Sequence, residues 1–157
     1  MSNENKDREN AIKKYDEYKT KYNLPSLNEL EEEFDFKLEE DIGISKAVIN
    51  QIWEKISSIK SYIEGILNPQ RYCCMIETKF LNPKEKEKLF NYYKKIMIEY
   101  WKTVQSTFAT SEEKLKQINN SYEFYKKVKQ FSKDYITRMI KGWSEEDKTE
   151  KQDDYIN

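Results

Sequence analysis

The chain has 157 residues, of which 37% are hydrophobic and 36% are charged, and its formal net charge is −1. This length fits one domain with a sizeable core, and the near-zero charge excludes a global attraction to nucleic acid or to anionic membranes. Three glycines and three prolines are too few for a sheet protein rich in turns. The composition therefore favours long helices joined by short links, with aromatic residues supplying much of the core.

No stretch of the sequence approaches the roughly 20 consecutive apolar residues that a membrane span needs. The first residues are rich in Asn, Glu and Lys and lack the apolar segment of a secretory signal. We therefore expect a cytoplasmic protein that has no membrane partner.

The N-terminal region predicts two short helices. Residues 1–6 are expected to be disordered, and a helix over residues 7–22 should stop at the sequence Asn-Leu-Pro that follows it. Ser26 then stands in the N-cap position of a second helix, with Glu29 at capping-box spacing. An acidic stretch with eight acids and one base covers residues 29–41, and residues 35–44 form a connector.

The strongest pattern in the chain is a stripe of isoleucines in residues 45–67. At spacings of three and four residues they share one face of a helix that Ser45 should cap. We expect later helices to cover this stripe completely and to leave no cavity, because burying each isoleucine stabilises the fold by roughly 1.5–3 kcal/mol. Its members are Ile49, Ile52, Ile56, Ile59, Ile63 and Ile66.

The opposite face of this helix carries small residues, among them Ser58, Ser61 and Gly65. A solvated face in so charged a protein should carry Lys and Glu, so we expect this face to be partly covered, either by the N-terminal helices or by a second copy. Isoleucine at both positions of a coiled-coil seam is compatible with more than two helices in contact.

Two further long helices are predicted after a short segment at residues 69–81. Asn82-Pro83 should open a helix that continues to about residue 109, and Thr110 with Glu113 should cap the last helix. The last helix should end at Gly142, and the acidic residues 144–157 should form a disordered tail.

The apolar pattern of the last helix changes sides at residues 119–121, whose sequence is Asn-Asn-Ser. Phe124 and Phe131 lie on the opposite side from the apolar residues that precede this tripeptide. Either the helix kinks or restarts at residues 119–121, or its second half presents its aromatic residues to another surface. Phe124 and Phe131 are therefore candidates for a protein-interaction face, together with the small residues of the isoleucine helix.

The sequence predicts no catalytic residue, cofactor, metal site or small-molecule substrate. It has no histidine, which excludes triads and metal sites that need one, and its three glycines are too scattered for a phosphate-binding loop. Cys73 and Cys74 are adjacent, a spacing unsuited to a zinc site. We interpret them as small buried residues, with a redox or vicinal-disulfide role as the alternative.

A basic face on the last helix is the one feature that favours nucleic acid. Lysines there lie among aromatic residues, and such a surface can follow a phosphate backbone while the rings stack on bases. In the alternative interpretation the aromatic residues belong to the core and the lysines are solvated, some of them facing the acidic stretch. The residues concerned are Lys126, Lys129, Lys133, Tyr122 and Tyr125.

Several packing and capping residues resemble those of small, uncharacterised helical proteins from archaea with reduced genomes. The resemblance covers about residues 22–143 and includes Leu24-Pro25-Ser26, the Leu-Phe-x-x-Tyr-Lys-Lys-x-Met run at 89–97, and Trp143. It implies an all-helical fold and no assigned activity, so it assigns no functional residue.

Together these patterns predict an all-α protein with one domain over residues 7–143. We expect an antiparallel bundle of three long helices, with one or two N-terminal helices packed against it. The predicted function is that of a non-catalytic protein-interaction or adaptor module that binds a protein partner or itself. The alternative is a nucleic-acid- or ribosome-associated protein that uses the basic face.

Overall fold

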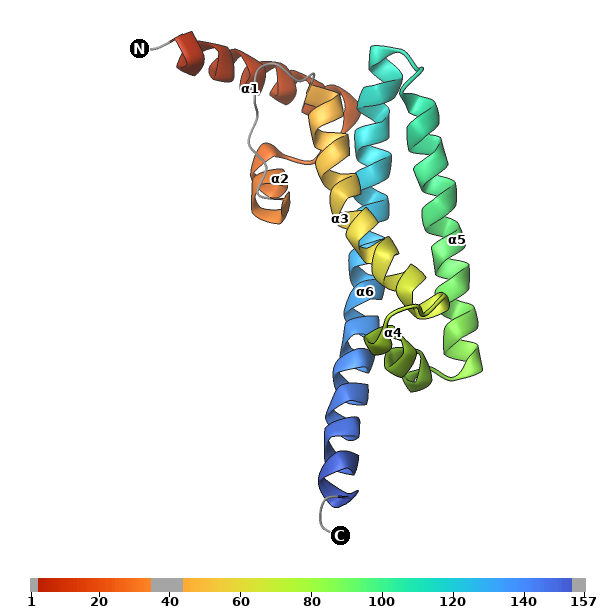
Figure 1. Ribbon diagram of the computed structural model, residues 1–157. Coiled ribbons are helices and arrows are strands. Elements are labelled where there is room, and N and C mark those ends of the chain that lie inside the picture. The colour runs from red at the N-terminus through yellow and green to blue at the C-terminus, as the bar shows by residue number, and fades with distance from the viewer. Residues whose placement is uncertain (1–2, 35–43, 154–157) are drawn as a thin grey trace. The chain divides into compact units, whose positions relative to one another are not determined.

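The computed structural model describes residues 3–34 and 44–153, and it places the side chains of residues 9–10, 12–34 and 45–146. Every regular element in these residues is helical, and no strand occurs among them (Figure 1). The predicted all-α class is therefore confirmed. The elements are α1 (Asn3–Tyr22), α2 (Leu27–Phe34), α3 (Ile44–Leu67), α4 (Tyr72–Glu77), the 3₁₀ helix η1 (Thr78–Phe80), α5 (Pro83–Ser106) and α6 (Ser111–Asp153).

The chain divides into two compact units. Unit 1 comprises residues 1–57 and 97–126, and unit 2 comprises residues 58–96 and 127–157. The three long helices α3, α5 and α6 each contribute residues to both units. The single domain predicted over residues 7–143 stays a prediction.

The buried core of unit 1 comes from the helices α1, α2, α3 and α6 and from the segment that joins α1 to α2. Helix α1 ends at Tyr22, and Asn23 adopts a left-handed conformation with φ of 53°, as asparagine often does after a helix. The fully buried Tyr15 donates a hydrogen bond of 2.9 Å to the carbonyl oxygen of Pro25, which fastens α1 to the segment before α2. The other buried apolar residues of unit 1 are Leu24, Leu30, Phe34, Val48, Ile49, Ile52, Trp53, Ile56, Leu115, Ile118 and Tyr125.

The core of unit 2 is smaller. It contains two buried apolar residues from the end of α3, two from α5, one from the segment before α5 and one from the middle of α6. Its buried apolar residues are Ile63, Ile66, Leu81, Leu89, Ile96 and Val128. Five of the six isoleucines of the α3 stripe are thus buried in one unit or the other, and Ile59 is half-buried.

Three helix starts have the capping interactions that the sequence predicts. The carboxylate of Glu29 accepts hydrogen bonds from the backbone and the hydroxyl of Ser26, and these bonds lower the pKa of Glu29. Reciprocal bonds join Asn82 to Glu85 before α5 and Thr110 to Glu113 before α6. These contacts satisfy backbone N–H groups that the helix itself cannot pair.

Several predicted boundaries are wrong. Helix α1 already begins at Asn3, within the segment expected to be disordered, and Ser45 lies inside α3 instead of capping it. Helix α6 continues past Gly142, its predicted end, to Asp153. The residues 1–2, 35–43 and 154–157, which include most of the predicted connector, lie outside the described part of the chain.

Gly142 shows why the end of α6 was misplaced. It has no positive φ angle, so it does not terminate the helix as a glycine C-cap would. Instead it is buried, and a Cβ atom added to it would overlap the ring of Phe80. Glycine is needed here for a close approach between α6 and η1, a requirement that local sequence cannot reveal.

Candidate functional site

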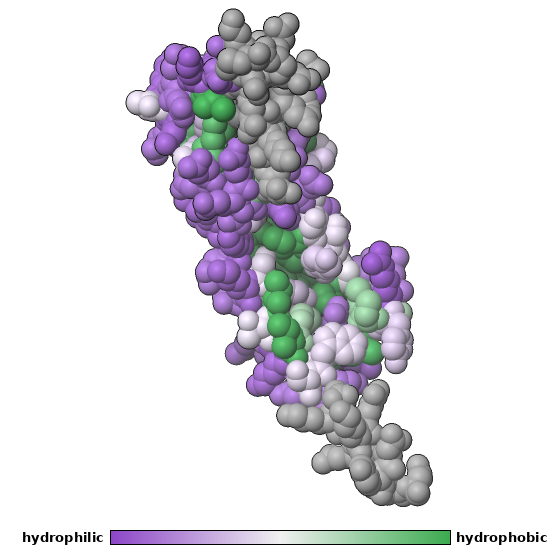
Figure 2. Space-filling model, turned by 90° about the vertical axis from the view of Figure 1, so that its left-hand side faces the viewer, coloured by the Kyte–Doolittle hydropathy of each residue, from purple (hydrophilic) through white to green (hydrophobic). Residues whose placement is uncertain are grey.

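An apolar groove with a volume of about 1030 Å³ lies in unit 2. Its walls come from the second half of α3, from α4 and the loop before it, from α5, and from residues 131–139 of α6. Figure 2 shows hydrophobic residues gathered on one face of the molecule among hydrophilic ones. Apolar side chains of the groove wall include Ile59, Ile63, Ile66, Phe131, Ile136 and Met139.

The groove contradicts the expectation that the isoleucine stripe is sealed without a cavity. Ile63 and Ile66 are buried, yet they and Ile59 line this open space. The small residues Ser61 and Gly65 also belong to its wall, and they cannot fill the space that a larger side chain would occupy. Periodicity identified the apolar face correctly but could not show how completely neighbouring helices cover it.

Large apolar residues stand exposed at the groove. Tyr62 is 72% exposed, Phe90 48% and Ile136 54%, and all three line it. Isolated exposed apolar residues are common on proteins, but a group of them around an apolar groove is typical of a binding surface.

Two carboxylates of the groove are held by side-chain donors of the same unit. Glu64 accepts a hydrogen bond of 2.5 Å from the Tyr93 hydroxyl and an ion pair of 3.0 Å from Lys60. Both contacts favour the charged form, so the pKa of Glu64 is lowered. Glu77 accepts a hydrogen bond of 3.1 Å from the indole nitrogen of Trp143.

Tyr135 supplies the groove wall with a buried hydroxyl that lacks a hydrogen-bond partner among the described residues. Burial raises the pKa of Tyr135, and the charges of Glu77 and Cys74 raise it further. A buried hydroxyl without a partner costs roughly 1–3 kcal/mol. Most such groups are paired in proteins, so this one is a candidate contact for a bound partner.

We expect Tyr135→Phe to stabilise the isolated protein by about 1 kcal/mol, because it removes a buried polar group that has no partner. Tyr93→Phe is the matched control, since it removes the hydroxyl that donates to Glu64 and should destabilise the protein by about 1 kcal/mol. Urea unfolding of both variants measures the two free energies. A loss of stability in Tyr135→Phe would show that its hydroxyl is already paired.

The residues predicted for a protein-interaction face have different environments. Ser61 and Gly65 line the groove, and Ser58 is exposed on the same helix. The ring of Phe131 stacks on Tyr92 at 3.7 Å between centroids and also lines the groove, and burial raises the pKa of Tyr92 to about 12. Phe124 belongs to unit 1, where it is half-buried and stacks on Trp53.

The residues predicted for a nucleic-acid face do not form one exposed set. Tyr125 is buried against Phe34 and donates a hydrogen bond of 2.5 Å to Glu33, so its ring is not free to stack on a base. Tyr122 is half-buried, and Lys126 lies over its ring at 5.2 Å from the centroid. Lys133 is exposed and Lys129 is half-buried, both in unit 2.

Part of the acidic stretch does meet the last helix. Lys126 forms an ion pair of 2.5 Å with Glu123. The hydrogen bond that Lys126 donates to Glu123 within this ion pair raises the pKa of Lys126, and the charges of Glu123, Tyr122 and Glu29 raise it further. The Glu33–Tyr125 bond joins α2 to α6, whereas the ion pair of Lys126 lies within α6, so ion pairing between the lysines of this face and the acidic stretch stays a prediction. The nucleic-acid alternative stays a prediction.

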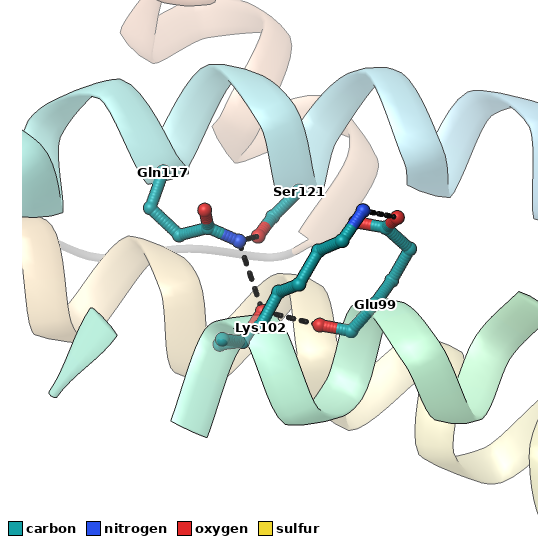
Figure 3. A network of polar contacts seen from close by, with 5 residues as sticks. Glu99, Lys102, Gln117 and Ser121 are labelled. Carbon is teal, nitrogen blue, oxygen red and sulfur yellow. Dashed lines mark hydrogen bonds and ion pairs between the residues drawn. The ribbon is translucent and has the colours of Figure 1, made fainter. Parts of the chain in front are cut away.

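The tripeptide at residues 119–121 does not restart the helix, because α6 is one continuous element from Ser111 to Asp153. Ser121 is buried in unit 1 and accepts hydrogen bonds of 3.2 Å from the Trp53 indole and 3.3 Å from the Gln117 amide. The same amide donates to Thr103, whose hydroxyl donates to the Glu99 carbonyl (Figure 3). Within this tripeptide, Ser121 therefore takes part in a buried polar network, and it does not mark the start of a helix.

Other kinds of site are not indicated in the described part of the chain. No group of three or more Cys, Asp or Glu side chains there is arranged to hold a metal ion. None of the helices described is both long enough and apolar enough to cross a bilayer. Cys73 and Cys74 are free thiols, the first exposed and the second half-buried.

Sequence reasoning missed the contribution of α5 to the groove and, apart from Phe131, that of α6. Phe90, Tyr93, Tyr135 and Met139 were assigned to no site, although each lines it. The sequence of α6 does contain a pattern that could have indicated the groove. Apolar residues at spacings of three and four form a second apolar stripe, which is more than the small core of unit 2 can bury; they are Ile136, Met139, Ile140 and Trp143. Comparison with known proteins adds no candidate, because no family model, curated protein or solved structure matches the chain.

Proposed function

We propose that the protein is a non-catalytic intracellular interaction module and that the groove of unit 2 binds an apolar segment of a protein partner. The observation that carries this proposal is the set of large exposed residues, Tyr62, Phe90 and Ile136, around an apolar groove. Their burial by a partner would remove apolar surface from water at about 25 cal/mol per Å². A structural role alone would not require them to be exposed.

The extent of the apolar surface favours a protein over a small molecule. Beyond Ile136, the same helix exposes Ile140, at 62%, and Trp143, at 38%. These residues follow one another at spacings of four and three, as the anchors of a helix-in-groove complex do. A small ligand confined to the groove would leave them in water.

We also propose that α3, α5 and α6 form the antiparallel bundle predicted from the sequence. Contacts within each unit support it. In unit 1 the network of Ser121 links α3, α5 and α6, and in unit 2 the Tyr93–Glu64 bond links α5 to α3 while the Tyr92–Phe131 stack links α5 to α6. Distances between spin labels on pairs of these helices would test the arrangement.

Site-specific photocrosslinking in cells tests the interaction. A benzophenone side chain at Tyr62 should crosslink to a discrete protein species, and Ile136→Asp should abolish that product. Tyr72 is the matched control, because it lies in the same unit and is 80% exposed but does not line the groove. The benzophenone at Tyr72 should give no such product.

The mass of the product identifies the kind of partner. A product with the mass of two copies would show self-association, and any other discrete mass would show a different protein. Equal labelling from Tyr62 and Tyr72, or a Tyr62 product that survives Ile136→Asp, would contradict the proposal.

A further inference from the structure

The two adjacent cysteines lie at the start of α4, with their sulfur atoms 3.9 Å apart. Cys73 is exposed and Cys74 is half-buried, and neither forms a disulfide. An exposed thiol in contact with a second thiol has its resolving partner already in place. Oxidation of the first sulfur would therefore be followed by attack from the second in the same chain.

Cys74 also belongs to the groove wall. Its sulfur packs against Gly65 of α3, where an added Cβ atom would lie 3.1 Å from it. A change in the position of Cys74 must therefore change the wall between α3 and α4.

A bond between these two sulfurs would strain the first turn of α4, because the sulfur atoms lie 3.9 Å apart and must approach to about 2.05 Å. Adjacent Cα atoms are about 3.8 Å apart, whereas unstrained disulfides join Cα atoms about 4.4–6.8 Å apart. The first turn of α4 is closed by a 3.0 Å hydrogen bond from the Met75 amide to the Arg71 carbonyl, and no side chain caps this turn. Since α4 has only 6 residues, its helical form is marginal by itself and its first turn can open at low cost.

We propose that Cys73 and Cys74 form a peroxide-sensitive oxidation site, and that the vicinal disulfide opens the first turn of α4 and alters the groove. The effect on the groove rests on the function proposed above. The thiolate of Cys73 attacks one peroxide oxygen, forming a sulfenic acid and releasing hydroxide, which takes up a proton to become water. Cys74 then attacks the sulfenic sulfur, the S–S bond forms, and the second oxygen leaves as water.

The electron balance follows directly from these two steps. The two thiols lose two electrons and two protons, and hydrogen peroxide is reduced to two water molecules. A strained disulfide is readily reduced, so a thiol reductant should restore both thiols by exchange and return the protein to its original state.

Treatment of the 157-residue chain with stoichiometric hydrogen peroxide tests the site. Peptide mass spectrometry should show the loss of two hydrogen atoms within the single peptide that contains both cysteines, reversed by a thiol reductant. Cys74→Ser is the matched control, because Cys73 then lacks its neighbour and should be found as a sulfenic or sulfinic acid. Independent oxidation of both thiols in the unaltered chain would overturn the proposal.

Hydrogen exchange tests the structural consequence. Oxidation should increase the exchange rate of the Met75 amide at least several-fold, and peroxide should have no such effect on Cys74→Ser. A disulfide that forms without loss of protection at Met75 would overturn the predicted opening of α4.

Photocrosslinking from Tyr62 tests whether the disulfide alters the groove. The yield of the crosslinked product should fall when the cysteines are oxidised and return when they are reduced. An unchanged crosslink in the oxidised protein would overturn the effect on the groove. If the reduced protein gives no crosslink either, the proposed function fails, while mass spectrometry and hydrogen exchange still decide the oxidation chemistry.

Discussion

Trp53→Ala should lower the free energy of unfolding by about 3–5 kcal/mol, the range for a large aromatic residue removed from a core. Trp53 is 8% exposed, and its ring contacts Tyr100 at 5.8 Å and Phe124 at 6.3 Å between centroids. Its indole nitrogen donates to Ser121. The substitution therefore removes packing from α3, α5 and α6 within unit 1 and leaves a cavity.

Trp101→Ala is the matched control, because Trp101 lies in the same unit and is 61% exposed. It should change the free energy of unfolding by no more than about 0.5 kcal/mol. Urea unfolding followed by far-ultraviolet circular dichroism measures both variants. Equal losses in the two would mean that Trp53 is not a core residue of unit 1.

Gly142→Ala should destabilise the protein by about 1–3 kcal/mol, although alanine is the better helix former by about 1 kcal/mol. The reason is the overlap that a Cβ atom would make with the ring of Phe80. That ring cannot retreat freely, because it packs edge-on against Trp143 at 5.5 Å between centroids. The carbonyl of the same residue also accepts a hydrogen bond from Arg138.

A double-mutant cycle isolates this contact. In a Phe80→Ala background the overlap is absent, so Gly142→Ala should become neutral or stabilising through its helix propensity. Thermal unfolding of the four proteins gives the coupling free energy. A Gly142→Ala variant that is stabilised in the unaltered background would contradict the close approach between α6 and η1.

The features that could be predicted correctly depend on residues close together in the chain. Ser26 and Glu29 are three residues apart, so the capping box forms from local geometry alone. The isoleucine spacing of α3 likewise needs only the pitch of the helix, and the structure buries five of those six residues. The all-α class follows from such local patterns.

The wrong predictions concern residues whose contacts are made with distant parts of the chain, which local sequence does not reveal. Ser121 interrupts an apolar pattern, but its neighbour in space is Trp53, which is 68 positions away in the chain. The candidate groove was missed for the same reason, since its walls come from four separate segments. Of the residues predicted for interaction, Ser61, Gly65 and Phe131 line the groove, while Tyr125 is occupied by its bond to Glu33.

The amino-acid sequence by itself determined the all-α class, how three of the helices begin, and which face of α3 is apolar. These properties arise from hydrogen bonds and side-chain spacings within a few residues. Only the tertiary structure decided that Gly142 meets Phe80, that Ser121 pairs with Trp53, and that part of the isoleucine stripe borders an open groove. Coverage of a helix face depends on the shapes of side chains brought together from distant segments, and no local pattern specifies how well those shapes fit.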